Sequence, residues 1–235
     1  MSFEIPQIKN DSVQKVEEQK IEIAKSQKEI EWENKQKEIE SWGDKKGLGI
    51  DEKIKDTVVA FNLMGLPTAQ SCEGHLESGI PVPWIRVEAP DQPAERFVDE
   101  GKIYKMTAEK FGIPIDDVKR GRNDEAWRSA QREISKLEET SEYQKWRRQN
   151  NKLMEKAGNL LGEFYRDKKV QDNIRLQIDE GGAGNFEIHN GGEDYEPIAR
   201  ELTDEQKKEL APRLVQYQEE MKKFTDFLRE RYFKS

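Results

Sequence analysis

The fold is decided by residues 49–88, which read GIDEKIKDTVVAFNLMGLPTAQSCEGHLESGIPVPWIRVE. The first part predicts a helix from Asp51 to Met64, because apolar residues recur at i, i+4 and i+7 and therefore share one helical face. These residues are Ile54, Val58 and Phe61. Asp51 is a residue type that caps helix N-termini, and Gly65 suits the left-handed position after a helix.

Two short strands are expected after this helix. Thr68 to Cys72 predicts the first, and Val82 to Glu88 alternates polar with apolar residues as a half-buried strand does. The intervening loop follows Cys72, the only cysteine, and contains His75, one of only two histidines. We therefore place the candidate site at Ser71-Cys72-Glu73-Gly74-His75.

Cys72 could have several roles. One is a small buried residue at a strand end, because free cysteines are often buried. Another is a nucleophile, which needs a lowered pKa and a base such as His75 or His189 within reach. Alternatively, the loop's backbone N–H groups could hold an anion together with His75. Cys72 and His75 are thus the candidate catalytic residues, with no reaction assigned.

A metal site would need three or four ligands. Cys72, Glu73, His75 and His189 could supply them, but a Cys-x-x-His pattern without a second cysteine is a weak signal. The sequence therefore predicts no metal site, and it names no cofactor.

A second group of polar residues follows the predicted strands. Residues 174–179 and 185–190 read as a hairpin, and each of its strands has one apolar and one polar face. If this hairpin shares a sheet with Val82 to Glu88, the polar residues line one wall. The residues expected to bind a ligand are Ser71, Cys72, Glu73, His75, Arg86, Arg175, Glu187 and His189.

Composition limits the class of protein. Of 235 residues, 37% are charged and 34% hydrophobic, against globular averages of about 25% and about 45–50%. A net charge of −8 argues against a broad electrostatic grip on nucleic acid, although it leaves room for a local basic patch. A single cysteine excludes an internal disulfide and favours a reducing compartment. Because no apolar run approaches the ~18 residues of a membrane span, we expect a cytoplasmic protein.

Most of the remaining chain predicts helix. Residues 1–47 are expected to form a helical extension, with Val16, Ile23 and Ile30 spaced by sevens as in a weak coiled coil. Residues 48–235 are expected to form one α/β domain with a helical insertion at about 94–169. Overall we predict an α+β fold with a small, mostly antiparallel sheet and packed helices.

Two helix starts within this region carry capping signals. Ser141 with Gln144 predicts a capping box, and Thr203 with Gln206 predicts another at the start of a last helix, 203–233. This last helix carries an apolar stripe at Leu210, Leu214, Tyr217, Met221, Phe224 and Leu228.

The stripe must be covered, because each large apolar side chain left in water costs roughly 1.5–3 kcal/mol. We predict that the N-terminal and last helices, together with a helix at 141–165, form a layer beside the sheet. A homodimer through these helical surfaces is a further expectation.

The residues Thr68, Ser71, Cys72, Gly74 and His75 form the pattern Thr-x-x-Ser-Cys-x-Gly-His after a helix. This pattern resembles a group of bacterial proteins with no firmly assigned activity. More remotely, it is similar to the Thr-x-Ser-Ser-Cys-Ser-Gly-Arg region of the wybutosine-synthesis methyltransferase family, although His75 stands where that family has Arg. The remote resemblance implies a tRNA-modifying enzyme that uses S-adenosylmethionine.

Together these observations favour a protein that binds a small anionic ligand at the Ser-Cys-Glu-Gly-His loop. Two alternatives stay open. One is an enzyme, either methyltransferase-like or with Cys72 and His75 as catalysts. The other is a structural or interaction protein in which the loop is only a tight turn.

Overall fold

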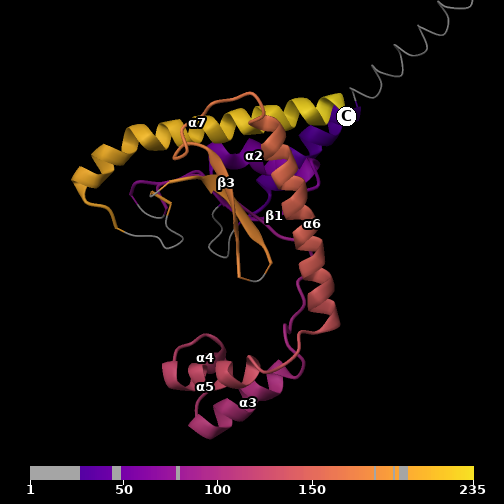
Figure 1. Ribbon diagram of the computed structural model, residues 1–235, viewed down its shortest axis with the longest axis vertical. Helices are drawn as coiled ribbons and strands as arrows, with labels where there is room; N and C mark the ends of the chain where they lie inside the picture. Colours follow the sequence, from indigo (N-terminus) through magenta and orange to yellow (C-terminus); the bar gives the residue numbers. More distant parts are fainter. Residues whose placement is uncertain (1–26, 44–48, 78–79, 183, 193, 196–200) are drawn as a thin grey trace, which may run out of the picture. The chain divides into compact units, whose positions relative to one another are not determined.

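The computed structural model describes residues 27–43, 49–77, 80–182, 184–192, 194–195 and 201–235. It confirms the predicted α+β class, in which helices pack beside a sheet (Figure 1). The sheet is antiparallel and four-stranded, in the order β1-β2-β4-β3. The strands are β1 (Thr68–Cys72), β2 (Trp84–Val87), β3 (Leu176–Glu180) and β4 (Phe186–Asn190). Within the described ranges, no helix is long and apolar enough to cross a membrane.

The chain packs as two units. Within the described residues, the first unit comprises the chain up to Val87 together with Ala157–Asp179 and Glu187–Ser235. The second comprises Glu88–Lys156 and Glu180–Phe186. The helices are α2 (Glu52–Leu63), α3 (Glu100–Phe111), α4 (Ile115–Lys119), α5 (Asp124–Ile134), α6 (Ser141–Phe164) and α7 (Asp204–Lys234).

The core of the first unit forms where α2 packs against α7, as Figure 1 shows. Phe61 of α2 meets Phe224 of α7 edge to face, with ring centroids 5.9 Å apart. Thr57 and Thr225 join the same two helices through buried hydroxyl groups, with their Oγ1 atoms 2.8 Å apart. The predicted α7 stripe is confirmed as buried at all its positions: Leu210, Leu214, Tyr217, Met221, Phe224 and Leu228. The capping box of Thr203 and Gln206 is also confirmed.

Residues 27–40 are helical and pack against the end of α7. The Trp32 ring lies 6.1 Å from that of Tyr232, measured between centroids, and Ile39 is fully buried. Ile30 is 51% exposed, so the predicted seam fails at this position because Trp32 and Ile39 form the buried face instead. Val16 and Ile23, the other positions of that seam, lie outside the described residues.

Strand β2 shows the predicted alternation. Ile85 and Val87 are buried in the core, whereas Trp84 and Arg86 on the opposite face are only half-buried. Cys72 of β1 stands directly opposite Trp84, so their side chains share that second face.

Strand β1 lies at one edge of the sheet. Its pairing with β2 is interrupted by a bulge between Thr68 and Gln70. The side chains of Ala69 and Gln70 are exposed there.

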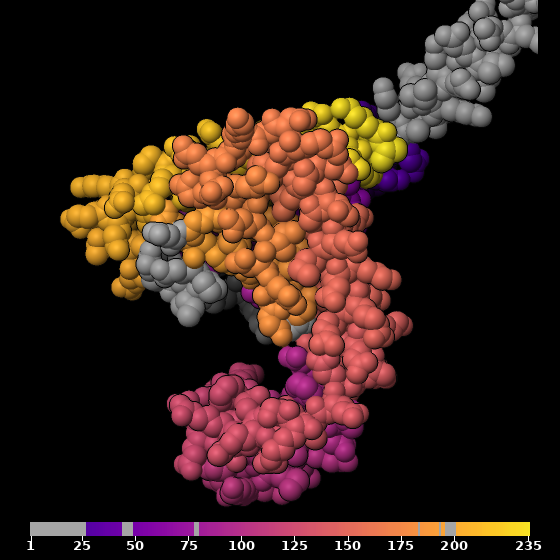
Figure 2. Space-filling model, viewed as in Figure 1, coloured from indigo at the N-terminus to yellow at the C-terminus, as the bar shows by residue number. Residues whose placement is uncertain are grey.

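Helices α3, α4 and α5 form the core of the second unit, and Figure 2 shows their side chains packed together. This core contains Ala108, Val118, Ala126, Ala130 and Ile134. The short helix α4 lies within the helical insertion predicted at about 94–169. At the start of α6 the predicted cap is wrong by one residue, because the Tyr143 N–H donates to Thr140 Oγ1, not to Ser141.

Candidate functional site

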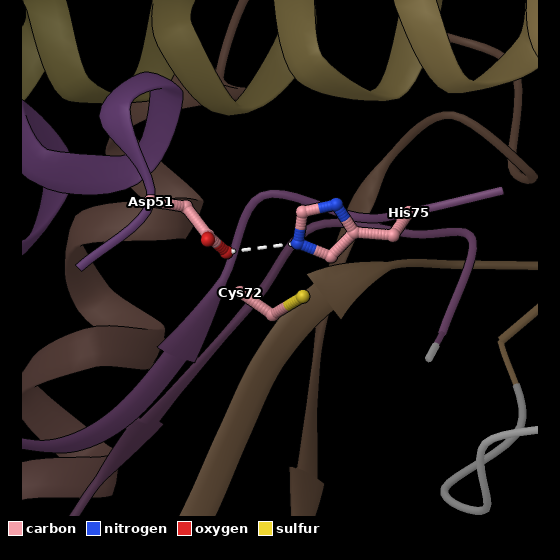
Figure 3. A group of neighbouring side chains, drawn as sticks. All are labelled: Asp51, Cys72 and His75. Atoms are coloured by element: carbon pink, nitrogen blue, oxygen red, sulfur yellow. Dashed lines mark hydrogen bonds and ion pairs between the residues drawn. The ribbon is translucent and has the colours of Figure 1, made fainter. Parts of the chain in front are cut away.

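Three side chains with different donor atoms converge at one end of α2. Asp51 immediately precedes that helix, Cys72 ends β1, and His75 lies in the following loop. Asp51 Oδ2 is 3.1 Å from His75 Nε2. The carboxylate oxygen, the Cys72 sulfur and the imidazole nitrogen all lie within 4.8 Å of one another (Figure 3).

Asp51 does not cap α2 with its side chain, contrary to the sequence prediction. Its carboxylate turns toward the loop and accepts a hydrogen bond from the Glu73 N–H at 3.1 Å. The Glu73 carboxylate takes over the capping role, because it accepts from the Lys53 N–H at 2.9 Å in the first turn of α2. The two acidic residues thus tie the helix start and the loop together.

Gly74 gives the loop its sharp turn. Its φ of +84° is a left-handed conformation, and an added Cβ would lie 2.7 Å from Leu214 Cδ1 of α7. Helix α7 also holds the loop through Gln218, whose Nε2 donates to the Glu73 carbonyl at 2.9 Å. The position of His75 relative to Cys72 is therefore fixed by the core.

The backbone N–H groups of the loop already have partners inside the protein. Glu73 donates to Asp51, and Gly74 donates to Cys72 Sγ at 3.4 Å. His75 donates to the Ile80 carbonyl at 3.0 Å. These three N–H groups are consequently not available to hold an anion.

Burial raises the pKa of the Cys72 thiol to about 11, and the neighbouring Asp51 and Glu73 carboxylates add to this effect. Among the described residues no hydrogen bond joins Cys72 to a histidine. The thiol is thus protonated at neutral pH, which is unfavourable for the predicted role as a nucleophile.

A pocket of about 650 Å³ opens beside this cluster. Asp51 forms part of its wall, and the exposed edge of β1 forms another part. Two aromatic residues, Trp42 and Trp84, also line it. The remaining residues of the lining are Gly43, Gly49, Ile50, Val58, Thr68, Ala69, Gln70 and Ser71.

A second polar cluster lies on the sheet itself. Arg86 of β2 forms an ion pair with Glu187 of β4, with Nε 2.8 Å from Oε1. The Tyr195 hydroxyl donates to the other oxygen of Glu187. Burial, followed by this carboxylate, raises the pKa of Tyr195.

His189 belongs to this second cluster and is only 3% exposed. Its ring stacks on that of Tyr195, with centroids 3.5 Å apart. Nδ1 lies 2.7 Å from the Asn190 carbonyl and Nε2 lies 3.0 Å from Asp179 Oδ2. Both nitrogens therefore lie against oxygen atoms of the protein, and neither is left for a ligand.

The structure therefore groups the predicted site residues by their contacts. Cys72, Glu73 and His75 gather around Asp51, while Ser71 lines the neighbouring pocket. Arg86, Glu187 and His189 belong to the sheet cluster. Arg175 is exposed, and its guanidinium lies 4.3 Å from the ring centroid of Tyr165.

Several residues of these two groups were missed from the sequence. Asp51 was interpreted only as a helix cap, although an acidic residue before a helix and a Cys-x-x-His loop after it were both visible. Nothing in the sequence indicated Tyr195, Asp179 or Trp42. Comparisons of the chain with protein-family models, with curated proteins and with solved structures find no match, and the resemblance drawn from the motif stays a prediction.

Proposed function

We propose that the protein binds a small molecule in the pocket beside the Ser-Cys-Glu-Gly-His loop. The observation that carries this proposal is the pocket of about 650 Å³ that shares Asp51 with the Asp51–Cys72–His75 cluster. Its volume falls within the roughly 300–1,000 Å³ that is common for ligand sites. A loop that served only as a tight turn would need neither the pocket nor the neighbouring cluster of three donor side chains.

The lining suggests the chemistry of the ligand. Trp42 and Trp84 offer apolar surfaces suited to a flat or aromatic body, while Gln70 and Ser71 offer hydrogen-bonding groups. None of the described residues that line the pocket is cationic, and Asp51 is acidic. An anionic ligand, as expected from the sequence, would therefore need its counter-charge from something bound beside the pocket.

The proposal can be tested with aromatic fragments of low molecular mass. Saturation-transfer NMR on the full chain would compare benzamide, which is neutral, with benzoate. Ala69 is exposed on β1 and lines the pocket, so Ala69→Phe places a ring in the space available to the ligand. Ala94→Phe is the matched control, because Ala94 is also exposed and lies outside this lining.

We expect saturable binding of benzamide to the wild type and to Ala94→Phe, and its loss in Ala69→Phe. Binding that is absent from the wild type, or that is unchanged in Ala69→Phe, would contradict the proposal. Thermal melting of each variant establishes that a loss of binding does not come from unfolding.

A further inference from the structure

We propose that Asp51, Cys72 and His75 form a site for a divalent transition-metal ion of the zinc class, with a coordination position left open for water or a ligand. The site goes beyond the proposed function, because it would exist whether or not the pocket holds an organic molecule. It also differs from the metal ligands considered from the sequence, since Asp51 replaces Glu73 and His189.

The donor atoms match the preferences of such an ion. Zinc binds cysteine sulfur, histidine nitrogen and carboxylate oxygen, and three protein ligands with one open position are typical of reactive zinc sites. At tetrahedral zinc, a nitrogen and an oxygen ligand stand about 3.3 Å apart, given metal–ligand distances near 2.0–2.1 Å. The observed separation between Asp51 Oδ2 and His75 Nε2 is 3.1 Å. The Cys72 sulfur lies within 4.8 Å of both of these atoms.

The surroundings hold the ligands in place. The Glu73 N–H orients the Asp51 carboxylate, and the Gly74 N–H points to the Cys72 sulfur. The backbone of His75 is pinned by its hydrogen bond to Ile80. Hydrogen bonds of this kind orient the ligands of protein metal sites and tune their donor strength.

The charge of the site favours a cation over an anion. The loop amides are already used within the protein, and Asp51 and Glu73 bring two carboxylates to the same place. When the metal binds, the Cys72 sulfur forms a bond to it and its proton is released to solvent, while the ring hydrogen that faces Asp51 moves from Nε2 to Nδ1 so that the Nε2 lone pair binds the ion. Access is available, because the His75 and Asp51 side chains are 39% and 33% exposed.

A metal here would also supply the counter-charge that the pocket lacks. A carboxylate on a ligand in the pocket could displace water from the open position. This part of the inference rests on the proposed function, whereas the metal site itself does not.

Cobalt(II) titration of the full chain tests the site, after removal of metals with a chelator and dialysis. Cobalt bound to a thiolate gives a charge-transfer band in the near ultraviolet, so the spectrum reports directly on Cys72. Zinc affinity is then measured by competition with a chromophoric chelator. The variants are Cys72→Ser, His75→Gln and Asp51→Asn. Glu52→Gln is the control, because Glu52 adjoins Asp51 but its side chain is 85% exposed.

We expect one equivalent of cobalt to bind to the wild type and to Glu52→Gln with the thiolate band. The band should disappear in Cys72→Ser, and zinc affinity should fall at least tenfold in His75→Gln and Asp51→Asn. His75→Gln removes a partly exposed ring, so it keeps the test valid if another variant fails to fold. Absence of stoichiometric binding, or equal affinity in His75→Gln and the wild type, would overturn the proposal.

The same fragments separate the two proposals. Zinc-loaded protein should bind benzoate at least tenfold more tightly than the metal-free form, with little change for benzamide. If benzamide binds and zinc does not, the pocket proposal stands and the metal site is wrong. If zinc binds and neither fragment does, the metal site stands and the pocket proposal is wrong.

Discussion

Asp51 Oδ2 lies 3.1 Å from His75 Nε2 across 24 positions of the chain. Asp51 can make this contact because its side chain does not cap α2. The side chain of Glu73, a residue of the loop, caps the helix instead. The exchange joins the helix start to the loop and leaves the Asp51 carboxylate beside Cys72. The Glu73 half of the exchange can be tested by substitution.

Replacing Glu73 by Ala should destabilise the protein by about 1 kcal/mol, the usual cost of losing a helix cap. The lost hydrogen bond is the one that Glu73 accepts from the Lys53 N–H. Glu52→Ala is the control, since it removes a carboxylate from the same helical turn, together with its exposed ion pair to Lys55, without removing a cap. Urea denaturation measures both variants. Equal losses would mean that charge at the helix end, and not the hydrogen bond, stabilises α2.

Gly74→Ala should be more destabilising than Gly112→Ala. Both glycines have positive φ, +84° and +62°, so each substitution carries a backbone cost of about 1–2 kcal/mol. Only at Gly74 would the new Cβ also clash, 2.7 Å from Leu214 Cδ1 and 3.0 Å from the Val82 carbonyl carbon. Thermal or urea denaturation gives the difference. Similar losses for the two variants would contradict the close packing of the loop on α7.

Replacing each of the two buried threonines, Thr57 and Thr225, by valine should reduce stability by different amounts. Thr225 donates its hydroxyl proton to the Met221 carbonyl at 2.9 Å, so Thr57 must be the donor in the bond between the two threonines. Thr225→Val therefore leaves a buried donor unpaired, at about 1–3 kcal/mol. Thr57→Val should cost less, because Thr225 keeps its acceptor.

A double variant provides the control for this pair. Thr57→Val with Thr225→Val should cost less than the sum of the single changes, because no unpaired hydroxyl remains. Additive losses in urea denaturation would indicate that the two hydroxyl groups are not coupled.

Cys72 of the metal-free protein should react slowly with iodoacetamide. Burial raises its pKa from 9.0 to about 11, so the reactive thiolate fraction near neutral pH falls about a hundredfold. The rate should rise about tenfold per pH unit until pH approaches the raised pKa. Because the fold favours the protonated thiol, its contribution to stability is complete below pH 9.0 and is lost as pH rises toward 11.

The same protein unfolded in urea is the reference for the alkylation rate, since its thiol regains an ordinary pKa. Mass spectrometry measures the modified fraction with time. A native rate equal to the unfolded rate at about pH 8 would show that the thiol is neither buried nor perturbed.

Local patterns were sufficient to predict much of the fold. The apolar spacing of α2, the alternation in β2 and the Thr203–Gln206 capping box each depend on residues close together in the chain, and each is confirmed. The predicted cap at Asp51 is wrong because the contacts of this residue are not local. Its carboxylate binds Glu73 and His75, which lie in a loop more than 20 positions along the chain.

The site was predicted less completely than the fold. Cys72 and His75 stood out because they are rare residue types placed close together. Asp51 and the pocket depend on how α2 and the edge of β1 meet, which no periodic pattern records. His189 was predicted to bind a ligand from the polar face of a strand, but the stacked ring of Tyr195 covers it.

The bulge between Thr68 and Gln70 has a consequence for how the protein behaves at high concentration. An edge strand presents unpaired backbone groups that can recruit a strand from another copy and so begin aggregation. A bulge breaks the regular repeat that such recruitment requires and increases the local twist. The edge of β1 can therefore be accessible to a small molecule and yet pair poorly with a strand from another copy of the protein.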